Sequence, residues 1–173
     1  MHPQTSQRIK QLRSWLAQQD FDALIIPHED EFLGEYIPEH NERLLWATGF
    51  TGSAGAAVIT KDKAAIFVDG RYTVQVRKQV PAEVFEYRHL HEEPLLEWIK
   101  DTLAINAKVA IDPRMHTAQW LKSATKTVEG FVTLETVSEN PIDLIWQDRP
   151  EVKVSDVRLM ELALVGQSSV DKR

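Results

Sequence analysis

The sequence has no cysteine and no long hydrophobic run. Without cysteine, the chain cannot form a disulfide, a thiolate metal site or a cysteine nucleophile. No apolar stretch approaches the ~18 residues of a membrane-spanning helix. The first twenty residues are polar and amphipathic, unlike a secretory signal. These absences suit a reducing cytosol, so we expect a cytoplasmic location and no membrane partner.

An excess of positive charge is also missing. Lysine and arginine number 20 against 26 aspartates and glutamates, giving a net charge of −6. This balance argues against nucleic acid or an anionic membrane as the main partner. A length of 173 residues fits one domain. A domain of this size buries roughly 70% of its unfolded surface, which is enough for a core without disulfide or metal cross-links.

Glycine is scarce, yet three of the seven glycines fall close together, at Gly49, Gly52 and Gly55. We expect a strand over 43–50 before this turn and a hairpin of two strands, 56–60 and 64–68, after it. Asp69-Gly70-Arg71-Tyr72 then opens a helix that runs to Gln79. Glycines between buried strands indicate that the backbone passes close to another group at this point.

The glycine turn does not match the common phosphate or nucleophile fingerprints. Its spacing is not G-x-G-x-x-G, and it leads into a strand, which argues against a dinucleotide site. The nucleophile elbow G-x-S-x-G fails because Thr51 stands where the first glycine should be. A serine hydrolase built on Ser53 is kept as an alternative. Ser123-x-x-Lys126 lacks the companion motifs of penicillin-binding enzymes and is taken as chance.

Two groups of histidines could in principle bind metal. His28 and His40 lie among the carboxylates of the polar segment 28–41, and His89 and His91 share one face of a strand expected over 84–91. Neither group has a further ligand at a recognised spacing. We therefore predict no metal site in this chain and interpret 28–41 as a solvated loop with one helical turn over 35–37.

Strand and helix patterns alternate through most of the chain. Beyond the hairpin, the sequence predicts strands over 21–26, 84–91, 108–112 and 131–137, and helices over 6–19, 71–79, 92–103, 117–128 and 141–146. This order indicates an α/β domain with a mixed sheet of about six strands and helices on both faces.

The end of the chain has a different character. Residues 151–173 contain apolar residues without a clear period, and 168–173 resemble a helix cap with no helix after it. We therefore expect a domain over 1–150, followed by a linker over 151–173 that leads into a second, missing domain.

Several short motifs together resemble a known family. In order and spacing, they are similar to the N-terminal domain of the Xaa-Pro aminopeptidases (aminopeptidase P), in the creatinase/prolidase family, three-domain cytosolic type. The match covers about residues 6–150. The motifs are Glu35-Tyr36-Ile37, Arg43 with Gly49-Phe50-Thr51-Gly52-Ser53-Ala54-Gly55, Asp69-Gly70-Arg71-Tyr72, and Ile145-Trp146-x-Asp148-Arg149-Pro150.

The resemblance implies a ribonuclease-H-like fold and a role beside a peptidase site. The family releases the N-terminal residue of peptides whose second residue is proline. Two divalent metal ions, usually manganese, activate the attacking water there. Their ligands lie in a C-terminal "pita-bread" domain, of which this sequence contains nothing. We therefore expect this segment to be inactive alone, with the catalytic domain of the same polypeptide and the peptide substrate as its partners.

Arg71 is the main candidate site residue. A guanidinium where a strand gives way to a helix can bind a carboxylate or carbonyl, although the residues alone favour a surface salt bridge or a cap to the neighbouring loop. The resemblance implies that the arginine of Asp-Gly-Arg-Tyr lies near the substrate. Gly52, Ser53 and Tyr72 are the candidate neighbours of Arg71. A stand-alone binding domain of the same fold, without peptidase activity, remains the alternative.

Overall fold

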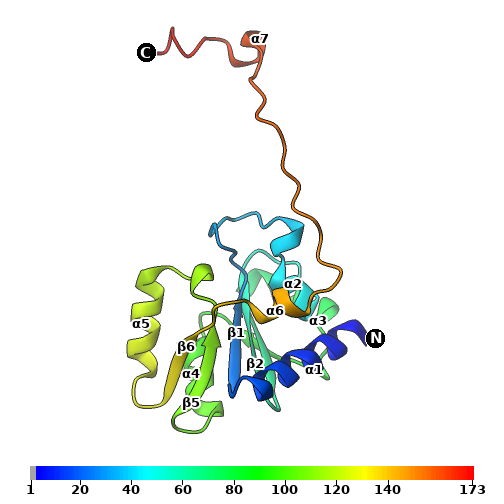
Figure 1. Ribbon diagram of the computed structural model, residues 1–173, viewed down its shortest axis with the longest axis vertical. Helices are drawn as coiled ribbons and strands as arrows, with labels where there is room; N and C mark the ends of the chain where they lie inside the picture. Colours follow the sequence, from blue (N-terminus) through cyan, green and yellow to red (C-terminus); the bar gives the residue numbers. More distant parts are fainter. Residues whose placement is uncertain (1–2) are drawn as a thin grey trace.

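The computed structural model describes residues 3–173 and is built around a six-stranded mixed sheet in the order β4-β3-β2-β1-β5-β6 (Figure 1). β2 is antiparallel to both β1 and β3, while the other neighbouring pairs are parallel. The predicted hairpin and mixed sheet are therefore confirmed. The strands are β1 (Ala23–Pro27), β2 (Gly55–Thr60), β3 (Ala64–Val68), β4 (Glu86–His89), β5 (Ala107–Ile111) and β6 (Val132–Thr136).

Helices cover both faces of the sheet, as the sequence predicts. The α-helices are α1 (Pro3–Gln18), α2 (Arg43–Thr48), α3 (Thr73–Gln79), α4 (Leu95–Thr102), α5 (Ala118–Val128), α6 (Pro141–Ile145) and α7 (Leu162–Val165). Within residues 3–173, short 3-10 turns come shortly before α2, α3 and α5. They are η1 (Glu39–Asn41), η2 (Gly70–Tyr72) and η3 (Pro113–Met115). Thr117 caps α5, because its hydroxyl accepts a hydrogen bond from the Trp120 N–H at 3.0 Å.

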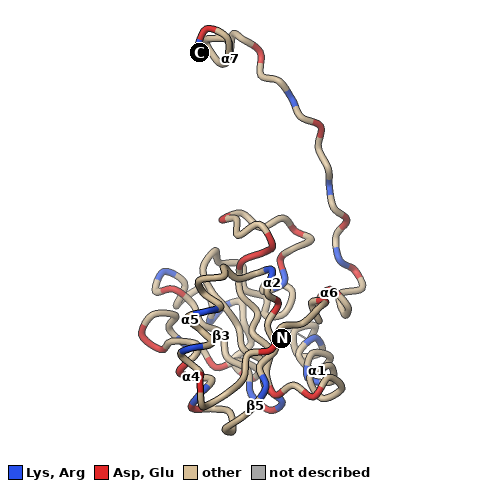
Figure 2. The backbone as a smooth tube through the Cα atoms, turned by 60° about the vertical axis from the view of Figure 1, so that its left-hand side comes forward, with Lys and Arg blue, Asp and Glu red and all other residues tan. Residues whose placement is uncertain are grey.

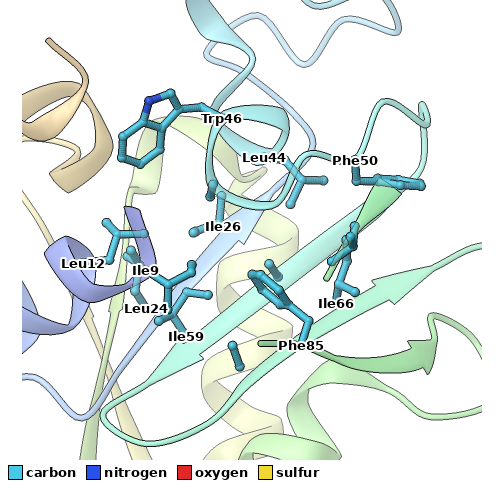
Figure 3. Close-up of a cluster of buried hydrophobic side chains, with 14 of the residues drawn as sticks. Ile9, Leu12, Leu24, Ile26, Leu44, Trp46, Phe50, Ile59, Ile66 and Phe85 are labelled. Atoms are coloured by element: carbon cyan, nitrogen blue, oxygen red, sulfur yellow. The ribbon is translucent and has the colours of Figure 1, made fainter. Parts of the chain in front are cut away.

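The central strands are buried on both faces, so successive residues of one strand enter different clusters. Leu24 of β1 belongs to the cluster under α1, α2, α3 and α6, and Ile25 belongs to the cluster under α4 and α5. Figure 3 shows the first cluster, with Trp46 and Phe50 near opposite ends of the labelled group. In Figure 1, α1 and α5 lie on opposite sides of the sheet.

The strand predicted over 43–50 is wrong, because residues Arg43–Thr48 form helix α2. Leu44, Trp46 and Ala47 are all buried, and a short apolar run of this kind fits a strand or a helix equally well. Gly49 ends the helix at a φ of +84°, and its N–H donates to the Leu45 carbonyl at 2.7 Å. The glycine turn therefore begins as a helix C-cap.

The helical turn predicted over 35–37 is also wrong, since the turn η1 forms at Glu39–Asn41 instead. Asp30 explains the irregular backbone before it. The Asp30 side chain is buried and accepts hydrogen bonds from the Phe32 N–H and from the Asn41 amide, both at 3.0 Å. A local side-chain acceptor of this kind competes with helix formation.

The chain after Pro150 leaves the folded body (Figure 1). Residues 151–161 have no regular secondary structure, and α7 is a single exposed turn. Charges of both signs alternate along this segment (Figure 2). No helix within residues 3–173 combines the length and the apolar character needed to cross a membrane.

Candidate functional site

One edge of the sheet brings together three of the segments that the sequence singles out. The register places the ends of β1, β3, β4, β5 and β6, and the start of β2, on the same side. We call this side the carboxyl edge. The loop 28–41, the glycine turn 49–55 and the Asp69–Tyr72 segment all lie there. Ligand sites of open α/β sheets form at the carboxyl ends of strands.

Arg71 is held at the carboxyl edge by the residue that ends β3. The Asp69 Oδ1 atom accepts hydrogen bonds from the backbone N–H and the Nε of Arg71, both at 2.9 Å. This hydrogen bond and the Asp69 charge raise the pKa of Arg71, and the Glu35 charge adds a smaller effect. The Arg71 side chain is 69% exposed, and its two terminal nitrogens have no partner within residues 3–173. The guanidinium is oriented at its base and open at its tip.

A second arginine at the carboxyl edge has nearly the same anchor. Asp112 follows β5, and its Oδ1 atom accepts from the backbone N–H and the Nε of Arg114 at 3.1 and 3.0 Å. Its Oδ2 atom also accepts from a terminal nitrogen of Arg114, at 2.7 Å. Arg114 thus makes three hydrogen bonds to Asp112, one of them from a terminal nitrogen, whereas Arg71 makes two to Asp69. Sequence reasoning missed Arg114, although the repeated Asp-x-Arg pattern after a buried strand could have revealed it.

Tyr72 and Ser53 contact each other beside Arg71. Their hydroxyl oxygens are 2.8 Å apart, and this hydrogen bond lowers the pKa of Tyr72. The Tyr72 ring also meets Phe50 edge to face at 5.5 Å, and the Arg71 guanidinium lies 5.4 Å from the Tyr72 ring centroid. The structure therefore brings the predicted residues together. Among the described residues, Ser53 pairs with a tyrosine and with no histidine base, so nothing supports Ser53 as a nucleophile.

The glycine turn is shaped by close packing. A Cβ atom at Gly52 would lie 2.2 Å from Cζ of Phe50, which is buried. Thr51 ties the turn to α3, because its N–H donates to Gln79 Oε1 at 3.0 Å and its hydroxyl accepts from Gln79 Nε2 at 2.8 Å. Because Gly52 has no side chain, the Phe50 ring can pack against its backbone and contact Tyr72 edge to face.

The histidines at this edge take part in local turns. The His89 Nδ1 atom accepts from the backbone N–H groups of His91 and Glu92, at 3.3 and 3.2 Å. Only His89 belongs to β4, so the strand predicted over 84–91 is shorter and the pair does not share a strand face. Within residues 3–173, no group of three histidines, aspartates or glutamates is arranged to hold a metal ion.

The base of loop 28–41 is fixed by a buried ion network rather than solvated. The Arg43 side chain is only 2% exposed and forms paired hydrogen bonds with Glu31 of the loop and Asp143 of α6, at 2.7–3.2 Å. Arg149 also binds Asp143 at 3.1 Å and donates to the His40 carbonyl at 2.6 Å. Sequence reasoning missed this network, because Arg43 and Asp143, and likewise Arg149 and His40, are 100 or more residues apart in the chain.

Comparison with known proteins identifies the family. Residues 8–147 match the family described as the Creatinase/Prolidase N-terminal domain. Human Xaa-Pro aminopeptidase 2 is 31% identical over 97% of this chain, which spans 25% of that relative. A crystal structure of X-prolyl aminopeptidase from Caenorhabditis elegans, described as a cytosolic enzyme with a di-nuclear active site, has a TM-score of 0.85 at 22% identity, covering 97% of this chain and 30% of that one.

A further solved structure consists almost entirely of the matched region. It is the N-terminal, creatinase/prolidase-like domain of a metallopeptidase from Corynebacterium diphtheriae, with a TM-score of 0.59 at 24% identity, covering 78% of this chain and 98% of that one. The present chain spans about a quarter of the length of the curated relatives it matches. On this evidence, the chain belongs to the Creatinase/Prolidase N-terminal domain family.

Proposed function

We propose that this chain is the non-catalytic N-terminal domain of a metal-dependent Xaa-Pro aminopeptidase, and that its carboxyl edge shapes the substrate entrance of that enzyme. The relatives support this assignment, because they are aminopeptidases four times as long as the matched segment. The absence of a metal-ligand cluster within residues 3–173 is consistent with chemistry carried by another part of the polypeptide.

The open guanidinium of Arg71 is the observation that carries the role in substrate binding. Asp69 binds the Nε of Arg71, while the two terminal nitrogens have no partner within residues 3–173 and the side chain is 69% exposed. Such a fork binds a carboxylate in bidentate geometry and can also donate to a carbonyl. The substrate would be a peptide with proline second, and Arg71 would hold its carbonyl or carboxylate groups. Gly52, Ser53 and Tyr72 would form the adjoining wall.

The metal centre of the proposed enzyme would lie outside this chain. We infer two divalent ions, because a relative is described as having a di-nuclear site, and we propose manganese, the metal usual in this family. The described residues do not fit such a centre, so no step of the reaction is assigned to them. We further propose a cytoplasmic location. We also propose a domain over 1–150 and a linker over 151–173, since residues 151–173 leave the folded body.

Replacement of Arg71 by alanine in the longer enzyme tests the proposal. A hydrogen bond to a charged group contributes about 1.5–3 kcal/mol, so kcat/KM on short Xaa-Pro peptides should fall about tenfold or more. Arg114→Ala is the matched control, because Arg114 has the same Asp-x-Arg anchor and a more fully occupied guanidinium. Equal kcat/KM for the wild-type enzyme and Arg71→Ala would refute the contact.

The 173-residue chain provides a separate test of its non-catalytic role. Supplied with Mn²⁺ and Xaa-Pro peptides, the purified chain should release no N-terminal residue, whereas the longer enzyme should. Metal-dependent cleavage by the short chain would overturn the assignment, because the described residues would then have to provide a metal centre.

A further inference from the structure

A groove with an aromatic wall lies away from the Arg71 site. It has a volume of about 710 Å³ and runs between α1, α2 and the segment 146–150. We call it the tryptophan groove. Trp46 lines it, as does Gly49, the first glycine of the turn 49–55. Arg71, Tyr72 and Ser53 do not line it, so substitutions in the groove leave those three side chains in place.

The aromatic wall already holds one cation of the chain itself. Trp46 and Trp146 stack with ring centroids 5.9 Å apart. The Arg8 guanidinium lies 5.0 Å from the Trp46 ring centroid and donates to the Trp46 carbonyl at 2.8 Å. A guanidinium over an indole is a favourable cation–π contact. Arg8 therefore covers part of this wall, and its contact shows that the wall pairs with a basic side chain.

Acidic side chains outnumber the basic one in the groove. Glu39, Glu42 and Asp148 line it together with Arg8. Glu42 is partly buried and has no ion pair within residues 3–173, and its burial raises its pKa. A carboxylate partly removed from water without a partner is stabilised by an incoming cation. The negative charge and the aromatic wall therefore both favour a cationic group.

We propose that the tryptophan groove docks a lysine or arginine side chain from the remainder of the longer polypeptide. This inference rests on the proposed function. The source follows from position, because Asp148 and Pro150 line the groove at the point where the chain leaves the folded body. Lys153 of the departing segment already comes within 3.9 Å of Glu39. A tethered partner has a high effective concentration, so a single weak contact is enough to seat it.

Titration of the 173-residue chain with N-acetyl-arginine amide and N-acetyl-lysine amide tests the chemistry. The indole N–H signals of Trp46 and Trp146 should shift in NMR spectra, while those of Trp15, Trp98 and Trp120 stay in place. The neutral N-acetyl-norleucine amide is the matched ligand control. Glu42→Gln should weaken binding about fivefold, whereas Glu129→Gln, which removes an exposed charge after α5, should leave it unchanged. Equal shifts with the neutral ligand, or no selective shift, would overturn the proposal.

The same titration of the longer polypeptide tests the source. If its own basic side chain occupies the groove, the signals of Trp46 and Trp146 start at the bound positions and do not respond to added arginine amide. A response equal to that of the short chain would refute docking of the remainder of the polypeptide. These outcomes are independent of Arg71, whose role is judged by peptide cleavage.

Discussion

Replacement of Arg43 by methionine tests how the carboxyl edge is held together. The Arg43 side chain is 2% exposed, and four hydrogen bonds at 2.7–3.2 Å join it to Glu31 and Asp143. Burial opposes the charge of Arg43, but these two partners outweigh burial and raise its pKa. Methionine fills a similar volume and leaves both carboxylates without this partner.

The expected loss of unfolding free energy is about 3–5 kcal/mol, the typical cost of removing one member of a buried ion pair. The measurement is urea denaturation followed by circular dichroism. Lys61→Met is the matched control, because Lys61 also approaches its carboxylate, on Asp22, at 2.7 Å but is 51% exposed. An exposed pair contributes about 0–1 kcal/mol.

A second substitution separates the missing charge from lost packing. Adding Glu31→Gln to Arg43→Met should recover about 1–3 kcal/mol, because it removes a carboxylate that has lost its main partner. The reasoning fails if Arg43→Met costs no more than Lys61→Met, since the network would then contribute no more than a surface pair.

Three further predictions concern other features. Gly52→Ala should cost about 1–3 kcal/mol in urea denaturation, because the new methyl group must displace the Phe50 ring; an unchanged stability would show that the turn relaxes freely. Thr117→Ala should cost about 1 kcal/mol by removing the cap of α5, measured in the same way. His116 stacks on Trp120 with ring centroids 4.0 Å apart, and burial lowers its pKa to about 4. Between about pH 6.5 and pH 4 the unfolded chain therefore binds a proton that the folded chain does not. As the pH is lowered through this range, the free energy of unfolding should decrease by up to about 3 kcal/mol. His116→Phe should flatten that part of the stability–pH curve, and an unaltered curve would contradict this account.

The sequence alone determined the local elements and the main candidate of the site. Period-2 and period-3.6 patterns depend on neighbours in the chain, so the hairpin, α1, α4 and α5 could be read directly. Asp69-Gly70-Arg71-Tyr72 predicted a strand end followed by a helix to Gln79, and the structure has the strand end, then the 3-10 turn η2 and the helix α3. Arg71 was therefore placed correctly at an edge, although its role in binding stays a prediction.

The tertiary structure decided what distant residues do together. Arg43 lies in a segment that fits a strand or a helix, and only packing on the sheet makes it helical and buries its guanidinium between Glu31 and Asp143. The tryptophan groove likewise depends on Trp46 and Trp146, which are 100 positions apart and meet only after the sheet has formed. Contacts at such separations leave no periodic signal in the sequence. The pattern along the chain predicted the hairpin and most of the strands, and the fold determined which charges and rings come into contact at their ends.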